Sequence, residues 1–231
     1  MLNPLKNIDQ LRKELIAQFN LIESGIMNFE LTDKIIKNGI GFFPYGSGLL
    51  GSDIVNLPQN GIMILGQDFG TECYLTQKVI DEGEVGNKTY NNLTNAIPVK
   101  DQANYFLTNL LIGLRIPPAK MTGKNPVLDQ PEANKKYLDA CFSFFEKQLL
   151  ATNPKLIVVL GAVPFKAILQ HYGCGTFSSF KENSPETQNY TISTNDKQYK
   201  IIAIPHPSMW HFNLNKNSQD KTIKLIQKLS K

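Results

Sequence analysis

The feature that most constrains the fold is a set of four short apolar runs, each ended by a polar or turn-forming residue. The runs are residues 61–65, 105–108, 156–160 and 200–204, and they end at Gly66, Asn109, Gly161 and Pro205. Their apolar character is nearly continuous rather than alternating, which is typical of strands buried on both faces. We therefore expect these runs to form the strands of a covered, mainly parallel sheet.

Helical patterns lie around and between these runs, at residues 8–22, 89–96, 131–150, 164–171 and 220–229. Asn7 followed by Gln10 resembles a capping box at the start of the first helix. Strands that alternate with helices predict a three-layer α/β/α sandwich around a central, mainly parallel four-stranded sheet. We expect one domain over residues 1–231, with residues 1–40 as an N-terminal helical extension packed on it.

Composition narrows the class of protein. No apolar run approaches the roughly 18 residues of a membrane span, and the first residues lack a signal-peptide pattern, so we expect a cytoplasmic protein with no membrane partner. Cys73, Cys141 and Cys174 form no closely spaced pair, which disfavours disulfides, zinc and iron–sulfur clusters. The net charge of +4 suits a polyanion. However, lysine-rich composition with only two arginines, Arg12 and Arg115, can also reflect an AT-rich genome, so charge alone decides nothing.

The first candidate motif follows the run at 61–65 and reads Gly66-Gln67-Asp68-Phe69-Gly70. Two glycines bracket a carboxylate at a strand end, so the backbone can turn tightly and approach a ligand. A phosphate-binding loop is an alternative, although the fingerprints of nucleotide-binding loops are absent. A turn-forming aspartate is the other alternative.

Two further motifs occupy strand ends. Asn109 ends the run at 105–108 and offers a donor and an acceptor side by side, as reading a pyrimidine edge requires. His206 stands between Pro205 and Pro207, and each proline fixes its own φ and restricts the residue before it. Each feature also has an ordinary interpretation, a cap or turn for Asn109 and a structural loop residue for His206.

Together, in this order, the motifs resemble the uracil-DNA glycosylase superfamily. Gly66-Gln67-Asp68 is similar to the start of Gly-Gln-Asp-Pro-Tyr-His in the main bacterial and eukaryotic branch, and His206-Pro207-Ser208 is similar to the family's His-Pro-Ser loop. The segment 154–169 looks like a strand and helix of several branches. The resemblance implies that Asp68 activates water, that His206 donates a hydrogen bond to O2 of the departing base, and that Asn109 reads uracil.

The resemblance also implies roles for the flanking residues. The base pocket would be lined by Gly66, Gln67, Phe69, Gly70 and Tyr90. Either Tyr90 or Phe69 could stack on the base, and we favour Tyr90, for which a buried ring on a short helix is the alternative. From their chemistry, we expect Ser47, Pro207, Ser208, Met209 and Trp210 to hold DNA, with Met209 and Trp210 suited to wedge into the gap left by a flipped base. An ordinary surface loop is the alternative for the turn that contains Ser47.

The chain departs from the family pattern in two places. Phe69-Gly70-Thr71 replaces Pro-Tyr-His, which removes the tyrosine that shields the pocket from a C5 methyl group. The four-cysteine cluster of the iron–sulfur branches is missing. We therefore expect a divergent member that tolerates 5-substituted bases.

The expected function is that of a monofunctional DNA glycosylase. It would remove uracil or a related damaged or mismatched base from single- or double-stranded DNA, as a monomer, without metal or cofactor. The main alternative is a module of the same fold that binds nucleic acid or a nucleotide without hydrolysis. A weaker one is an enzyme that cleaves free nucleosides or nucleotides.

Overall fold

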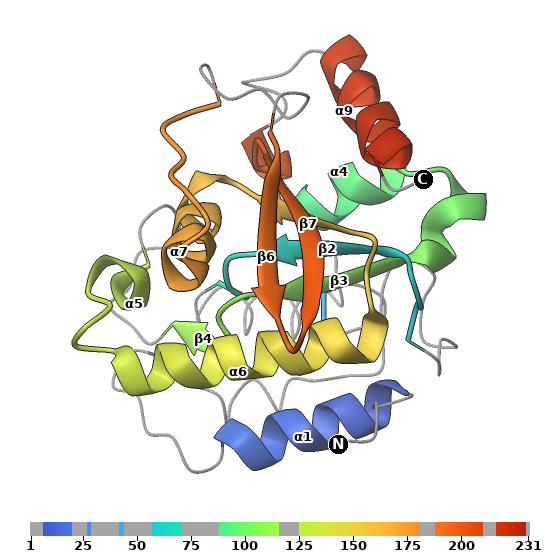
Figure 1. Ribbon diagram of the computed structural model, residues 1–231. Helices are drawn as coiled ribbons and strands as arrows, with labels where there is room; N and C mark the ends of the chain where they lie inside the picture. The colour runs from blue at the N-terminus through green and yellow to red at the C-terminus, as the bar shows by residue number, and fades with distance from the viewer. Residues whose placement is uncertain are drawn as a thin grey trace, which may run out of the picture.

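A five-stranded sheet forms the centre of the computed structural model, which describes residues 7–19, 27–28, 42–43, 57–70, 88–115, 125–180, 188–209 and 216–229 (Figure 1). The strand order is β3-β2-β5-β7-β6. Four strands run parallel, β2 (Ile62–Gly66), β3 (Tyr105–Asn109), β5 (Leu156–Leu160) and β7 (Lys197–Ile204). These strands coincide with the four apolar runs, and the mainly parallel sheet predicted from them is confirmed.

The fifth strand, β6 (Tyr190–Thr194), was not predicted. It pairs antiparallel with β7 at the edge of the sheet through a turn at Asn195 and Asp196. Both turn residues have positive φ, 51° and 58°, as a tight hairpin of matching twist requires. The strand escaped detection because Ile192 is its only buried residue, so it lacks a continuous apolar run.

Helices cover both faces of the sheet, so the three-layer architecture is also confirmed. The helices α6 (Lys135–Thr152) and α7 (Ala162–Tyr172) lie on one face, and α1 (Ile8–Phe19) packs on α6. The opposite face is covered by α4 (Lys88–Ala96) and α9 (Lys216–Leu229). Because successive strand side chains point to opposite faces, Met63 and Leu65 of β2 join the first core while Ile62 and Ile64 join the second.

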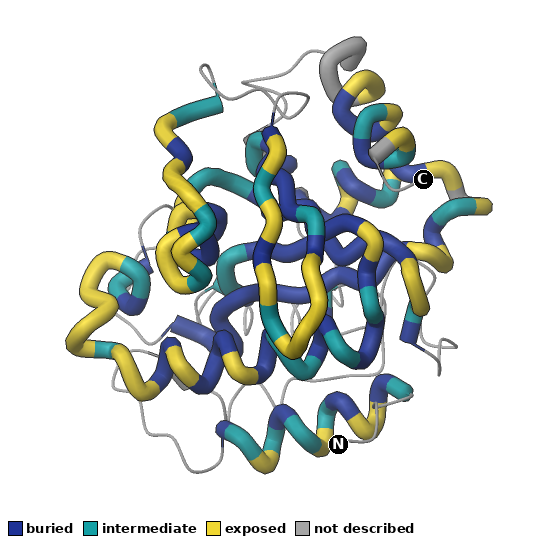
Figure 2. Tube along the Cα trace, viewed as in Figure 1, coloured by how far each residue is buried: buried dark blue, intermediate teal, exposed yellow. Residues whose placement is uncertain are grey.

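The burial pattern follows these layers, with buried strands in the middle and exposed residues on the outer helix faces (Figure 2). Cys141 is buried in the core on α6, as expected from its apolar helical face. The start of α1 is capped as predicted, because the Gln10 N–H donates to Asn7 Oδ1 at 2.9 Å. The described part of this helix ends at Phe19, and residues 20–22 of the predicted helix lie outside the described residues.

Several short elements complete the described structure. They are η1 (Val99–Asn104), α5 (Pro126–Asp129), η2 (Pro207–Met209), and β1 (Met27–Asn28), which pairs antiparallel with β4 (Leu114–Arg115). The predicted helix at 131–150 begins at Lys135, because residues 131–134 form a turn.

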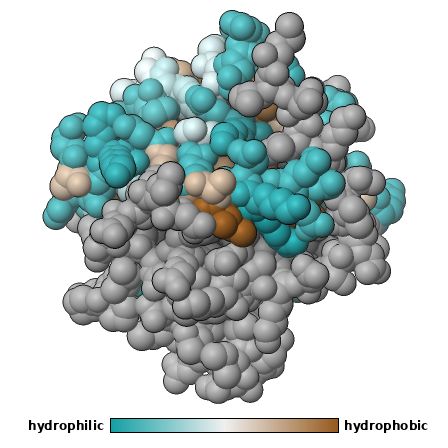
Figure 3. All heavy atoms as spheres, turned by 90° about the horizontal axis from the view of Figure 1, so that it is seen from below, coloured by the Kyte–Doolittle hydropathy of each residue, from teal (hydrophilic) through white to brown (hydrophobic). Residues whose placement is uncertain are grey.

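The described surface in Figure 3 is largely hydrophilic, with a small apolar patch where it meets atoms that are not described. Val163 is the one exposed large hydrophobic residue among those described. None of the helices in the described part of the chain is both long and apolar enough to cross a membrane.

Candidate active site

The carboxyl ends of the parallel strands bring the predicted residues to one edge of the sheet. Gly66 and Asn109 are register partners at the ends of β2 and β3, and Asp68 follows two residues later. His206 follows β7 and lies against the end of β5, since a Cβ built on Gly161 would be 3.8 Å from His206 Cβ. Asp68, Asn109 and His206 therefore meet at the edge where open α/β sheets hold ligands.

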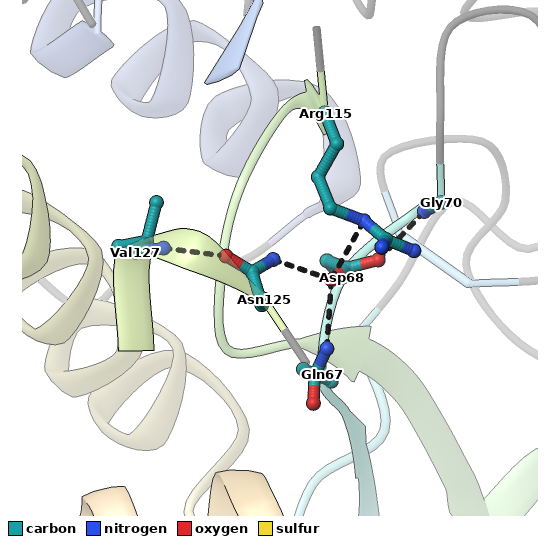
Figure 4. A network of polar contacts seen from close by, with 6 residues as sticks. All are labelled: Gln67, Asp68, Gly70, Arg115, Asn125 and Val127. Carbon is teal, nitrogen blue, oxygen red and sulfur yellow. Dashed lines mark hydrogen bonds and ion pairs between the residues drawn. The ribbon is translucent and has the colours of Figure 1, made fainter. Parts of the chain in front are cut away.

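Asp68 lies at the centre of a polar network, shown in Figure 4. Its Oδ2 accepts hydrogen bonds from Gln67 Nε2 at 2.9 Å and Asn125 Nδ2 at 2.6 Å, and lies 3.4 Å from Arg115 Nε. Its Oδ1 accepts from the Gly70 N–H at 2.8 Å. The Asp68 and Arg115 side chains are only 5% and 4% exposed, so the pair is largely buried from bulk solvent.

Arg115 reaches Asp68 because two loops continue the pairing of β2 and β3 beyond the sheet. The Leu110 N–H donates to Gly66 O and the Arg115 N–H donates to Gly70 O, both at 2.9 Å. Sequence reasoning did not single out this arginine as part of the site. The signal was its rarity, because arginine has the planar fork suited to buried ion pairs and this chain otherwise uses lysine.

Asn125 was missed as well, and it links Asp68 to α5. It is fully buried and caps the helix, since its Oδ1 accepts from the Val127 N–H at 2.9 Å while its Nδ2 faces Asp68 (Figure 4). An asparagine followed by Pro126 is a common helix start. Nothing in the sequence indicates that the free half of its amide serves a carboxylate 57 positions earlier in the chain.

Asn109 rests directly over the backbone of Gly66. A Cβ at Gly66 would collide with Asn109 Oδ1, and Phe42 Cε1 would lie 3.5 Å from it. Glycine is therefore required at this position so that the amide can pack against the strand end. Phe42, a half-buried residue that sequence reasoning did not identify, consequently lies beside the Asn109 amide.

His206 is held by its own loop and by α4. Its Nδ1 lies 2.8 Å from Ser208 Oγ and accepts from the Ser208 N–H at 3.3 Å. The Asn92 side chain on α4 donates to the Pro207 carbonyl at 2.7 Å. Because a backbone N–H can only donate, Nδ1 acts as an acceptor, and the neutral imidazole carries its proton on Nε2.

Burial lowers the pKa of His206 below its usual range, and the nearby negative charge of Asp68 opposes that shift. The imidazole is accordingly neutral at pH 7, with Nε2 as a hydrogen-bond donor. The opposing effect of Asp68 also indicates that the two groups lie within electrostatic reach of each other.

The two rings predicted in the base pocket are both covered. Tyr90 is 5% exposed and belongs to the core beneath α4, where burial raises the pKa of its hydroxyl to about 12. Phe69 is 8% exposed and belongs to the core on the other face of the sheet. Phe42 is the more accessible ring near Asn109.

Gly70 has a φ of +94°, a conformation that side-chain-bearing residues rarely adopt. The tyrosine that occupies the matching place in the main branch of the family would be strained on this backbone. The loop conformation at Gly70 therefore disfavours a tyrosine at this position, and the open space beside the base remains a prediction.

Part of the predicted DNA-binding surface lies outside the described residues, namely Ser47 and Trp210. Pro207 and Ser208 are described, and the backbone of Met209 belongs to η2. Among the described residues, no group of three or more His, Cys, Asp or Glu side chains is placed to hold a metal ion.

The site thus combines a buried carboxylate, an amide and a neutral imidazole at one edge of a parallel sheet. A comparison with protein-family models matches residues 53–230 to the uracil DNA glycosylase superfamily. A search of curated proteins finds no match.

Proposed function

The chain belongs to the uracil DNA glycosylase superfamily, and from this premise we propose that it hydrolyses the N-glycosidic bond of uracil, or of a related damaged or mismatched base, in DNA. The observation that carries the proposal is the meeting of Asp68, Asn109 and His206 at the carboxyl edge of the sheet. A binding module needs neither a buried carboxylate nor an imidazole placed as a donor.

The chemistry follows from the donors and acceptors. As the bond between C1′ and the base nitrogen breaks, its electron pair leaves with the base, and the oxygen of water bonds to C1′. Asp68 Oδ1 accepts a hydrogen bond from this water and then takes its proton, which passes to solvent. His206 Nε2 donates to O2 of the departing base, where negative charge develops.

Asn109 supplies base specificity. Its amide can donate to O4 and accept from N3–H of uracil, whereas cytosine presents the reversed pattern. Its packing over Gly66 fixes the amide against the strand end, so that little freedom is lost when the base binds. Gln67 and Gly70, which both contact Asp68, would form the neighbouring wall, whereas Phe69 is packed in the core behind it.

The stacking ring in this proposal is Phe42 rather than Tyr90. Phe42 is half-buried beside Asn109, while Tyr90 is covered by the core under α4. Stacking requires an accessible ring face, which favours Phe42.

DNA binding completes the proposal. The target base must leave the helix before it can enter this site, and Met209 and Trp210 would fill the gap. Pro207 and Ser208 lie next to His206, where the phosphates of a flipped nucleotide would come, and Ser47 would add a further phosphate contact.

A base-release assay tests the function directly. Labelled oligonucleotides bearing uracil, hypoxanthine, or thymine opposite guanine are incubated with the protein, and abasic sites are then cleaved with alkali. Strand cleavage that depends on His206 is the expected result. Tight binding of these oligonucleotides without any base release would favour the non-catalytic module instead.

A further inference from the structure

The carboxylate of Asp68 is almost saturated by donors from its own protein. Oδ2 receives Gln67 Nε2 and Asn125 Nδ2 and faces Arg115 Nε, whereas Oδ1 receives only the Gly70 N–H among the donors of the described residues. A carboxylate oxygen accepts about two hydrogen bonds along its lone pairs, so the described residues fill Oδ2 and leave one position on Oδ1.

The charged and neutral groups around Asp68 also bear on how its carboxylate is used. Among the described groups near it, Tyr137 and His206 are both neutral at pH 7, because burial raises the pKa of the first and lowers that of the second. Arg115 is the cation paired with it, and the pair as a unit is neutral.

We propose that Arg115 and Asn125 are positioning residues that lock Asp68 so that only Oδ1 can receive the attacking water. The inference rests on the proposed glycosylase function and concerns how its carboxylate is used. Because Arg115 offsets its charge, such a carboxylate mainly orients the attacking water and does less to stabilise positive charge on the sugar. Arg115 touches neither substrate nor water in this assignment and acts through Asp68.

The residue type at position 115 supports the assignment. The chain uses lysine almost everywhere, yet its two arginines are both at low-exposure sites. Arg12 has its guanidinium 6.0 Å from the centre of the Phe43 ring, and Arg115 pairs with Asp68. A planar guanidinium fixes the orientation of a carboxylate, whereas an ammonium group acts as a point charge.

A double-mutant cycle on base release tests the inference. Single-turnover excision of uracil is measured for the wild type, Arg115→Ala, Asp68→Asn and the double variant, with Arg12→Ala as the matched control. Arg115→Ala is expected to slow excision about 100-fold, the scale of a misplaced reacting group. In the Asp68→Asn background the same change should have an effect below about threefold, because the proposed contribution of Arg115 to base release is made through Asp68.

Chemical rescue by added guanidinium distinguishes a positioning role of Arg115 from a purely structural one, because a purely structural defect would not be reversed by it. Millimolar guanidinium should restore a large part of the rate of Arg115→Ala and none of the rate of Asp68→Asn. If Arg115→Ala does not fold, Arg115→Lys takes its place, and it should be about tenfold slow because it retains the charge and loses the fork.

The outcomes separate this inference from the function on which it rests. A wild-type protein that releases no base from any oligonucleotide overturns the proposed function and the inference with it. Excision by the wild type together with an unimpaired Arg115→Ala variant overturns the inference alone. Equal losses from Arg115→Ala in both backgrounds, without guanidinium rescue, would also overturn it and assign Arg115 to packing.

Discussion

The two ends of the site, around Asp68 and around His206, are built in different ways. Asp68 is enclosed by donors from its own loop and from two distant segments, and it forms a buried ion pair. His206 depends on its neighbour Ser208 and on one hydrogen bond from α4 to its loop. We therefore expect the Asp68 end to matter for both activity and stability, because it contains a buried ion pair, and the His206 end to matter mainly for activity.

The sharpest test of this contrast is Asp68→Asn, which should slow excision by several orders of magnitude and also destabilise the protein. Removing one partner of a buried pair leaves the Arg115 charge uncompensated, at a cost of about 3–5 kcal/mol. Single-turnover kinetics and denaturant unfolding measure the two effects, and DNA affinity should change little. The control is Asp139→Asn, which removes an exposed pair with Lys135. An Asp68→Asn variant as stable as the wild type would contradict the expectation that the Asp68 end contributes more to stability than the His206 end.

The opposite pattern is expected for His206→Ala. Excision should fall about 10²–10³-fold, the usual loss for one donor to developing negative charge. The unfolding free energy should change far less than in Asp68→Asn, because no buried charge loses its partner. His171→Ala is the matched control, since that imidazole stacks on Phe142 with ring centres 3.6 Å apart. A His206 variant with weaker binding and an unchanged chemical step would contradict the assignment.

Gly70 extends the contrast to specificity, because its N–H donates to Asp68 and, under the proposed function, its lack of a side chain would leave space beside C5 of the base. The wild type should excise 5-bromouracil, and thymine opposite guanine, within about 10–200-fold of uracil, since one methyl group is worth about 1–3 kcal/mol. Competition between these oligonucleotides measures the ratio. Gly70→Tyr should lose stability by about 1–3 kcal/mol because φ is +94° here. Sharper rejection by the wild type would indicate that another side chain fills the space.

Substitution of the aromatic rings Phe42 and Tyr90 should have the next smaller effect on excision. Phe42→Leu should slow excision about tenfold, because stacking of a base on an aromatic ring is worth about 1–3 kcal/mol. Tyr90→Leu should instead lower stability, since it removes a ring from the core under α4. Tyr90→Phe keeps the ring and serves as the control. Loss of excision in Tyr90→Leu at unchanged stability would return the stacking role to Tyr90.

These expectations also show what the sequence can and cannot reveal. The four strands and the placement of Asp68, Asn109 and His206 at their ends follow from continuous apolar runs and short motifs, which are local signals. Arg115 and Asn125 carry no such signal, because their role depends on two loops meeting beyond the sheet. The positive φ of Gly70 could not be predicted either, because it depends on the conformation of the folded loop and not on the local sequence pattern. At the Asp68 end, the carboxylate could therefore be predicted but its partners Arg115 and Asn125 could not. At the His206 end, the imidazole and its partner Ser208 belong to one sequence motif.

The smallest effect concerns pH and the His206 end. Burial, opposed by Asp68, lowers the pKa of folded His206 below the usual value of about 6.5 for an unfolded chain. Below pH 6.5 the unfolded chain therefore binds a proton that folded His206 resists. The unfolding free energy should consequently fall as the pH drops from 6.5 toward the folded pKa, and level off below it. Part of this dependence should disappear in His206→Asn. Part should remain, because burial also lowers the pKa of His171, and His171→Asn is the matched control.

Denaturant unfolding between pH 7 and pH 5, with proton NMR of the imidazoles, measures the unfolding free energy and the pKa of each histidine. A His206 that titrates at or above 6.5 would show that the Asp68 charge prevails over burial, and would couple the two ends more tightly than their separate hydrogen bonds suggest.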